Sequence, residues 1–446
     1  MGSTGMNQTV SATDDPAIEL LLRFARSTSE AGGYPSSELE PRILELARAM
    51  GLHSVQVSAT PTVINLTVGP IPNQQVYLLR VQPRGVDLNA ISRLDEIAAT
   101  VADGRLDHRR ALAEIDQLGQ HPLCHSHWLV VGAHGLMGAA LAPILGGGWR
   151  ESAGATVVGL AVGILTRVVA RSERSMALVT PLGAFLASFF ASALAYAGFD
   201  IAVAIVTFAA LIVFFPGMPM AIGVRELASA HLEAGLANSV NAGVQLVGIV
   251  FGVAVGRSLV TRWLGSIPLN TPNPFPHGVE IVAAALVGLA FIVLLRAPLR
   301  DAIWTCSAAV LAIVANVAAT SVLGKIAGVF AAALLVGLGA NAVARYFRRS
   351  PLVFVVPGLL MLIPGSIGYS SAVNFLAGRT VTAIDTAFDT FVTLLAIAYG
   401  LLAATLILPD QPAKRTTQQR VNVTQINALK LTTPRSNSDA EVSVKR

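Results

Sequence analysis

The run Phe214-Phe215-Pro216-Gly217-Met218-Pro219-Met220 interrupts an apolar stretch that extends from Ile201 to Gly223. Proline lacks a backbone N–H and clashes with the preceding helical turn, so a helix must break here. In hydrocarbon, the carbonyl groups freed by a break need partners, and a broken span is tolerated only where it is buried in protein or lines a cavity. The run therefore predicts a membrane protein with an interrupted helix that is buried in the protein or lines a functional cavity.

A second apolar stretch, Leu352 to Val373, is interrupted at Pro357-Gly358 and again at Ile363-Pro364-Gly365. Matched Gly/Pro-interrupted segments in two halves of a chain are typical of a transporter's binding site. The first-half Pro216-Gly217 matches one of these two breaks, and the sequence leaves both registers open.

Composition places most of the chain in a membrane. Of 446 residues, 53% are hydrophobic and 13% are charged, whereas soluble domains carry about 25% charged residues. Residues 1–126 and 410–446 are polar, and 127–409 are almost uncharged. The net charge of +5 comes largely from basic residues at span ends and in the tail, where membrane orientation and anionic lipid explain it. Nucleic acid is not an expected partner.

The polar N-terminal part reads as a mixed α/β domain over 15–126, after a disordered N-terminus at 1–14. Helical periodicity follows Asp15-Pro16 and recurs from Ser37 to Met50, from Leu88 to Ala102 and from His108 to Leu118. Strands are predicted at 54–60, 62–68 and 75–81. Because Met1 to Pro16 lacks the apolar core of a signal peptide, we expect this domain in the cytoplasm.

From His127 onward the sequence predicts about ten spans of about 20 residues. Their limits are 127–147, 152–171, 176–197, 201–223, 240–259, 280–296, 302–321, 326–346, 351–372 and 387–409. We therefore predict two five-helix repeats, 127–264 and 280–409, a linker loop at 265–279 and a disordered basic tail at 410–446. Since five is odd, the repeats cross the membrane in opposite senses. Trp149-Arg150-Glu151-Ser152 and Leu299-Arg300-Asp301-Ala302 echo each other at the second span of each repeat.

Basic residues favour an orientation with both termini in the cytoplasm. With the first domain inside, inner loops and the tail hold more Lys and Arg than outer loops. The inner set is Arg171, Arg174, Arg225, Arg296, Arg300, Arg345, Arg348, Arg349, Lys414, Arg415 and Arg420, and the outer set is Arg150, Arg257, Arg262, Lys325 and Arg379.

Polar residues near the breaks are candidates for substrate binding. The predicted set is Pro216, Gly217, Glu226, Asn238, Asn241, Pro364, Gly365, Ser370 and Asn374. Glu226 could exchange a proton or meet an ammonium group; a solvated loop charge paired with Arg225 is the alternative. The amides and hydroxyls could instead serve interhelical hydrogen bonds.

Asp389 is the second predicted proton site. Asp385 and Asp389 lie one helical turn apart and share a face, where paired carboxylates can share a proton. Asp385 could simply cap its helix, and Asp389 lies deeper in the span. Pairing Pro216-Gly217 with Pro364-Gly365 sets Glu226 opposite Asn374 and Asn241 opposite Asp389, which is the register we favour for testing.

No metal, cofactor or enzymatic site is predicted. The residues His121, Cys124, His125 and His127 fit no standard zinc spacing. Gly146-Gly-Gly148 lacks the following Lys-Ser/Thr of a phosphate loop. The polar domain has no nucleophile elbow, so catalysis ranks below transport.

The order of these elements resembles the threonine/serine exporter family of bacterial inner-membrane proteins. The resembling parts are His53-Ser-Val-Gln-Val-Ser-Ala-Thr60, the helix from Val86-Asp87-Leu88, Gly146-Gly-Gly-Trp149 and the Pro-Gly elements of both halves. The resemblance covers roughly residues 15–410, and it rests on the arrangement rather than on one diagnostic motif.

The resemblance implies a multi-pass protein of the cell inner membrane that exports small amino acids such as L-threonine and L-serine. It implies secondary transport, with antiport against protons, and a homo-oligomer is open. A dicarboxylate exporter of the same fold is the alternative, and a passive channel is the second class of function.

Overall fold

A computed structural model describes residues 15–82, 85–120, 125–169, 176–268, 270–276, 278–363, 365, 370–371, 374 and 379–409. The predicted disordered N-terminus (1–14), the basic tail (410–446), His121, Cys124 and Pro364 lie outside the described residues. Residues up to 409 belong to one compact unit, so a domain boundary at 126 stays a prediction.

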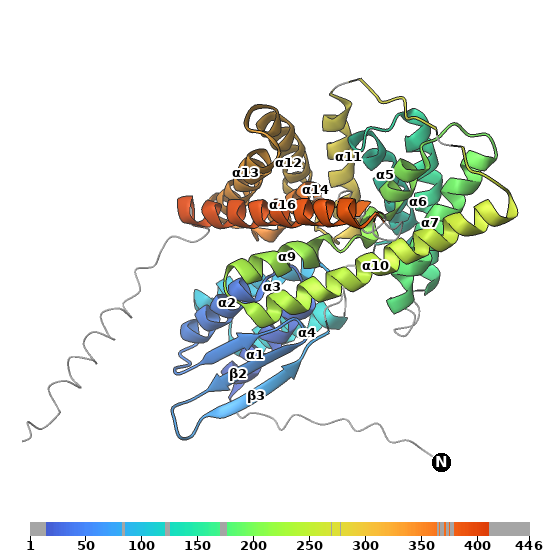
Figure 1. The fold of residues 1–446 in the computed structure, drawn as a ribbon. Helices are drawn as coiled ribbons and strands as arrows, with labels where there is room; N and C mark the ends of the chain where they lie inside the picture. Colours follow the sequence, from blue (N-terminus) through green and yellow to red (C-terminus); the bar gives the residue numbers. More distant parts are fainter. Residues whose placement is uncertain are drawn as a thin grey trace, which may run out of the picture. The chain divides into compact units, whose positions relative to one another are not determined.

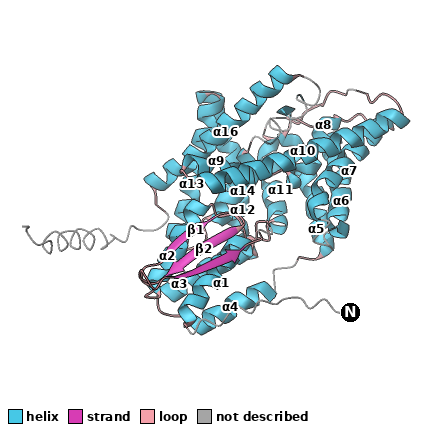
Figure 2. Cartoon of the chain, turned by 60° about the horizontal axis from the view of Figure 1, so that its bottom comes forward, coloured by secondary structure: helices cyan, strands magenta, loops and turns pink. Residues whose placement is uncertain are grey.

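Residues 15–120, here called the N-terminal segment, hold four helices and a small sheet (Figure 2). The helices are α1 (Pro16–Glu30), α2 (Ser36–Ala49), α3 (Leu88–Ala102) and α4 (His108–Gln120). The strands β1 (Gln56–Ala59), β2 (Val63–Val68) and β3 (Gln75–Arg80) pair antiparallel in that order. Alternation in β2 buries Ile64 and Leu66, which share a core with Leu20, Leu21 and Phe24 of α1. The helices start at residues 16, 36, 88 and 108, close to the predicted positions.

Apolar helices follow from His127. They are α5 (His127–Ile144), α6 (Trp149–Val169), α7 (Met176–Tyr196), α8 (Val203–Leu211), α9 (Gly217–Ala228), α10 (Leu232–Trp263), α11 (Val279–Leu294), α12 (Ala302–Leu323), α13 (Lys325–Phe347), α14 (Leu352–Leu362) and α16 (Thr380–Ile407) (Figure 1). In the described part of the chain, seven are long and apolar enough to span a membrane, or eight if a bent pair counts as one span. Two more, α11 and α14, are shorter apolar helices. The fold is therefore that of an α-helical polytopic membrane protein, and ten spans stay a prediction.

The bent pair contains the first predicted break. A short 3-10 turn, Ile212–Phe214, extends α8, and the chain then turns by 64° into α9. The helix thus breaks at Phe215-Pro216, where the missing proline N–H prevents continuation.

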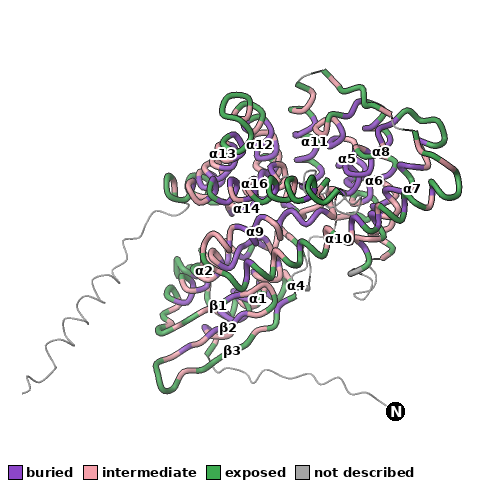
Figure 3. The backbone as a smooth tube through the Cα atoms, viewed as in Figure 1, coloured by how far each residue is buried: buried purple, intermediate pink, exposed green. Residues whose placement is uncertain are grey.

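The longest helix, α10, packs closely on α7 through glycine. A Cβ atom on Gly252 would lie 2.2 Å from the carbonyl oxygen of Pro181, and one on Gly256 would lie 2.5 Å from that of Phe185. Only glycine permits this approach of two backbones, a common device in membrane bundles. Much of α10 is exposed elsewhere (Figure 3), and its exposed apolar residues include Leu236, Val244 and Phe251.

The N-terminal segment contacts three connections between membrane helices. Arg225 beside the α9–α10 connection pairs with Glu38, Arg296 before α12 pairs with Asp87 at 3.1 Å, and Arg349 before α14 lies 3.7 Å from Glu96. These three arginines belong to the predicted inner set. Other connections contact one another instead: Asn270 Nδ2 lies 3.5 Å from the carbonyl oxygens of Phe199 and Ile201.

Candidate functional site

The two breaks begin with the same backbone geometry. Phe215 has φ −66° and ψ 128°, and Ile363 has φ −62° and ψ 129°. In both, the glycine two residues on donates its N–H to the carbonyl oxygen, with Gly217 N to Phe215 O and Gly365 N to Ile363 O both 2.7 Å. In the first break this hydrogen bond closes a three-residue turn. Pro357 lies instead inside α14, so the element that matches Pro216-Gly217 in geometry is the one at 363–365.

The two breaks also lie against each other. A Cβ atom on Gly217 would lie 3.0 Å from Ile363 Cδ1, and one on Gly365 would lie 3.1 Å from ring carbons of Phe215. Segments almost 150 positions apart in the sequence thus meet through their glycines, with no space left between them. The contact brings together three predicted site residues: Pro216, Gly217 and Gly365.

Glu226 is buried, with 1% of its surface exposed. Its Oε1 accepts the backbone N–H of Ser36 at 2.7 Å, and its Oε2 accepts Nδ2 of Asn238 at 2.8 Å. Ser36 is the first residue of α2 and has no side-chain cap, so the carboxylate of α9 satisfies a helix-end N–H of the N-terminal segment. The structure thus joins two predicted residues, Glu226 and Asn238, and Glu226 is not a solvated loop charge.

Arg225 does not pair with Glu226, contrary to the alternative considered from sequence. Its Nη2 donates to Oε1 of Glu38, in the first turn of α2. Its Nε is buried and has no hydrogen-bond partner among the described residues. Arg225 also lines a small, mostly apolar pocket between the N-terminal segment, α9, α14 and α16, whose walls include Gly33, Pro35, Met218 and Leu359.

Three of the remaining predicted residues, Asn241, Asn374 and Asp389, have other described partners. Asn241 is exposed on α10 and accepts Nε2 of Gln245 at 3.2 Å. Ser370 is exposed, and the half-buried Asn374 accepts the N–H of Arg379 through its carbonyl at 2.9 Å. Asp389 pairs with Lys325 at 3.1 Å, with 59% of its side chain exposed. No described contact joins Asp389 to the other candidates.

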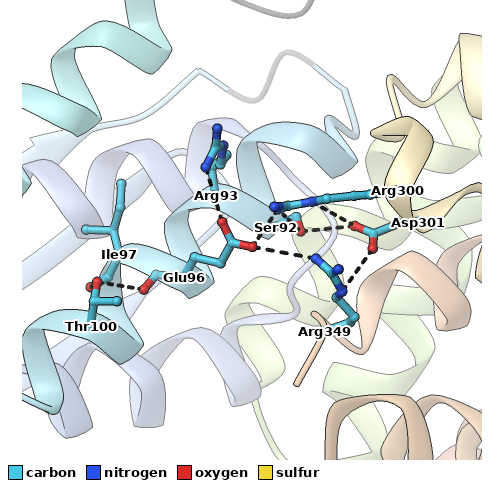
Figure 4. A network of polar contacts seen from close by, with 8 residues as sticks. All are labelled: Ser92, Arg93, Glu96, Ile97, Thr100, Arg300, Asp301 and Arg349. Atoms are coloured by element: carbon cyan, nitrogen blue, oxygen red, sulfur yellow. Dashed lines mark hydrogen bonds and ion pairs between the residues drawn. The ribbon is translucent and has the colours of Figure 1, made fainter. Parts of the chain in front are cut away.

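A second buried carboxylate, Asp301, lies in a polar network with the N-terminal segment (Figure 4). Ser92 donates to its Oδ2 at 3.2 Å, and Arg349 Nε lies 3.5 Å from its Oδ1. Arg300 bridges the network by pairing with Glu96 at 2.6 Å. Asp301 therefore ties the start of α12 both to α3 and to the residues just before α14.

Glu151 is the corresponding buried carboxylate of the first half, and it too connects separate segments of the chain. It is 2% exposed, and it accepts the N–H groups of Gly148 at 2.8 Å and Ala202 at 3.0 Å. Ala202 directly precedes α8. Glu151 and Asp301 are the residues that echo each other in sequence, and each holds the chain just before the corresponding interrupted element.

Sequence reasoning missed His134 of α5, which is 3% exposed. Its Nδ1 lies 2.8 Å from the carbonyl oxygen of Val130, and its Nε2 is without a partner in the described part of the chain. The signal was available, because an ionisable residue within an apolar span is a functional candidate by default.

Comparisons with known proteins agree with this architecture. A family model described as "Putative threonine/serine exporter" matches residues 21–260, and one described as "Threonine/Serine exporter, ThrE" matches residues 280–407. A "Threonine/serine exporter" of Corynebacterium glutamicum is 22% identical over 91% of this chain and 85% of its own length. A "Probable threonine/serine exporter" of Mycobacterium tuberculosis is 23% identical over 81% of this chain and 70% of its own length.

No solved structure matches the chain. The family models cover both halves, and the apolar helices agree with a multi-pass membrane protein. The chain belongs to the threonine/serine exporter family, a family of transporters and not of enzymes.

Proposed function

We propose that this protein is a secondary active exporter of small L-amino acids, with L-threonine and L-serine as substrates and the proton motive force as the driver. The observation that carries the proposal is the contact between two breaks that begin with the same backbone dihedral angles, at Phe215 and Ile363, and carry the same N–H to carbonyl hydrogen bond. The family relationship supports the substrate class.

The substrate would bind where the two breaks meet. A helix N-terminus carries partial positive charge and a C-terminus partial negative charge. At the first break the 3-10 turn ends at Phe214 and α9 begins at Gly217, so ends of opposite sign lie side by side. This arrangement suits a zwitterion, whose carboxylate would face the start of α9 and whose ammonium group would face the freed carbonyls.

In the structure this place is filled by Gly217, Gly365 and the side chains they touch. Substrate binding therefore requires the breaks to separate. We propose that the halves 127–264 and 280–409 form inverted repeats that rock about this contact. The family models support the division, since they stop at 260 and resume at 280.

Glu226 and Asp389 are the proposed proton sites. Each oxygen of Glu226 accepts one hydrogen bond, and a proton on Oε1 would turn that acceptor into a donor and release the Ser36 N–H. Protonation would thus loosen the N-terminal segment from α9. Asp389, paired with Lys325, would exchange its proton beside the start of α13.

We propose that the N-terminal segment and the arginines it contacts face the cytoplasm. The basic connections beside α9, α12 and α14 share its side, and cytoplasmic connections of membrane proteins are enriched in Lys and Arg.

Uptake into inside-out vesicles tests the function. Labelled threonine, serine and a dicarboxylate are offered with and without a proton gradient. We expect saturable, gradient-dependent uptake of the two amino acids. Dicarboxylate uptake alone would assign the other substrate class, and non-saturating flux that ignores the gradient would assign a passive channel.

A further inference from the structure

The N-terminal segment presents two groups of opposite character to neighbouring residues of α9. Glu38 places a carboxylate on the guanidinium of Arg225, and Ser36 places an N–H on the carboxylate of Glu226. A carboxylate and an N–H donor held close together are the two polar groups of an α-amino acid.

Arg225 also lines a small pocket that lies close to the breaks. Gly33 and Pro35 of the N-terminal segment line it together with Met218 of α9 and Leu359 of α14. Gly217 and Leu360, the next residues along α9 and α14, lie against each other, with a Cβ on Gly217 3.4 Å from Leu360 Cδ2. Two residues that line the pocket, Met218 and Leu359, are thus adjacent in sequence to residues that touch at the breaks.

The loop between α1 and α2 contributes Gly33 and Pro35 to the pocket wall. A Cβ atom on Gly33 would lie 3.2 Å from Leu352 Cδ1 at the start of α14. Tyr34 lies 3.4 Å from Ser350 Oγ and donates to Asp95 at 2.7 Å. Residues 33–38 thus bridge α9 and α14, the two elements that must separate for transport.

The guanidinium of Arg225 has a donor that could bind a further anion. Its side chain is 12% exposed, one arm is held by Glu38, and the buried Nε has no hydrogen-bond partner among the described residues. Guanidinium binds carboxylate through two parallel N–H donors, so an incoming carboxylate can use Nε as well as the arm that Glu38 now occupies.

We propose that Arg225 and Glu226 form an entry site for the α-amino-acid zwitterion, and that residues 33–38 occupy this site as an internal substrate mimic. The substrate carboxylate would replace Glu38 on Arg225, and its ammonium group would replace the Ser36 N–H on Glu226. Substrate thereby displaces the loop and frees the pocket. The proposal rests on the proposed function, since it takes an amino acid as the ligand.

Equilibrium binding of L-threonine to the purified full-length protein tests the entry site, with Glu38→Gln as the key variant. The neutral amide competes less well for Arg225, so we expect threonine affinity to rise about five- to tenfold. Glu30→Gln is the matched control, because Glu30 pairs with Arg26 one turn earlier in α1 and should leave affinity unchanged. Arg225→Gln should weaken threonine binding at least tenfold and abolish the preference for threonine over its methyl ester, which lacks the carboxylate charge.

Hydrogen exchange of the unmodified protein gives a second test that needs no variant. Saturating threonine should speed exchange of the Ser36 amide, whose N–H the structure gives to Glu226. A purely structural Glu226 predicts unchanged or slower exchange, and that result would overturn the proposal. So would unchanged or weaker threonine binding in Glu38→Gln. If the unmodified protein neither binds nor exports threonine or serine, the proposed function itself fails. If it does both, and Glu38→Gln and Arg225→Gln bind threonine with the affinity of the unmodified protein, only the entry site fails.

Discussion

Replacing Gly365 by alanine tests whether the contact between the breaks belongs to the transport cycle. The added Cβ would lie 3.1 Å from Cδ1 and Cε1 of Phe215 and 3.3 Å from Cζ of Phe208. Carbon atoms normally approach to about 3.5–4.0 Å, so the Phe215 ring must move by several tenths of an ångström. That ring is backed by Phe208, with centroids 5.8 Å apart. Overpacking of this kind costs about 1–3 kcal/mol.

The penalty falls only on states in which the breaks touch. If export passes through such a state, a penalty of this size slows threonine export by about five- to 150-fold. Export into medium from preloaded proteoliposomes measures the rate. Gly243→Ala is the control, because a Cβ on Gly243 of α10 meets nothing within 4 Å. The double variant Gly365→Ala with Phe215→Leu makes room for the methyl group and should restore the rate to within about twofold. Normal export in Gly365→Ala, or no rescue by Phe215→Leu, would refute the reasoning.

Three other predictions concern buried or charged groups. Glu226→Gln and Asp389→Asn should each reduce proton-driven export about tenfold without loss of membrane insertion; an unchanged pH profile in both would remove them as proton sites. Glu151→Ala leaves two backbone N–H groups without their acceptor and should destabilise the protein by about 2–4 kcal/mol. The measurement is the Tm in detergent, with the exposed Glu233→Ala as the control. A Tm decrease no larger than that of the control would contradict the role of Glu151 as the acceptor for these N–H groups. Burial raises the pKa of Tyr34 well above its usual value, so the folded state holds the phenolic proton more tightly than the unfolded state. Stability from this group is complete below pH about 10 and is lost as pH rises further; Tyr34→Phe should therefore be less stable than the unmodified protein at pH 8 by about 1 kcal/mol, with the difference shrinking above pH 10 in chemical denaturation.

Local chemistry made the breaks predictable, because proline and glycine act on their own helix. The helix is interrupted at Pro216-Gly217 as expected, and α14 likewise ends just before Ile363. Pro357 looked equally disruptive in sequence, yet it lies within α14 and is buried. A proline there leaves the carbonyl oxygen of Val353 without its helical N–H, and the hydroxyl of Thr305 donates to that oxygen at 3.3 Å instead. Sequence alone could not choose between the two registers.

Contacts between residues far apart in the chain could not be predicted from the sequence. Ser36 and Glu38 read as the ordinary start of a surface helix, and nothing local links them to Arg225 and Glu226 some 190 positions later. Pairing Arg225 with its neighbour Glu226 was the natural local guess. Consecutive residues on a helix do not face each other, and the tertiary contact gives each a different partner.

The length of α10 has a mechanical consequence. Its 32 residues rise about 48 Å at 1.5 Å each, whereas the hydrocarbon core of a bilayer is about 30 Å thick. Such a helix must tilt or protrude, and the tilt changes with bilayer thickness. Gly252 fixes its second half against α7, while its first half holds Asn238 on Glu226. A change in lipid acyl-chain length would therefore change the tilt of α10 and move Asn238 relative to the Glu226 carboxylate. Transport would then depend on hydrophobic mismatch.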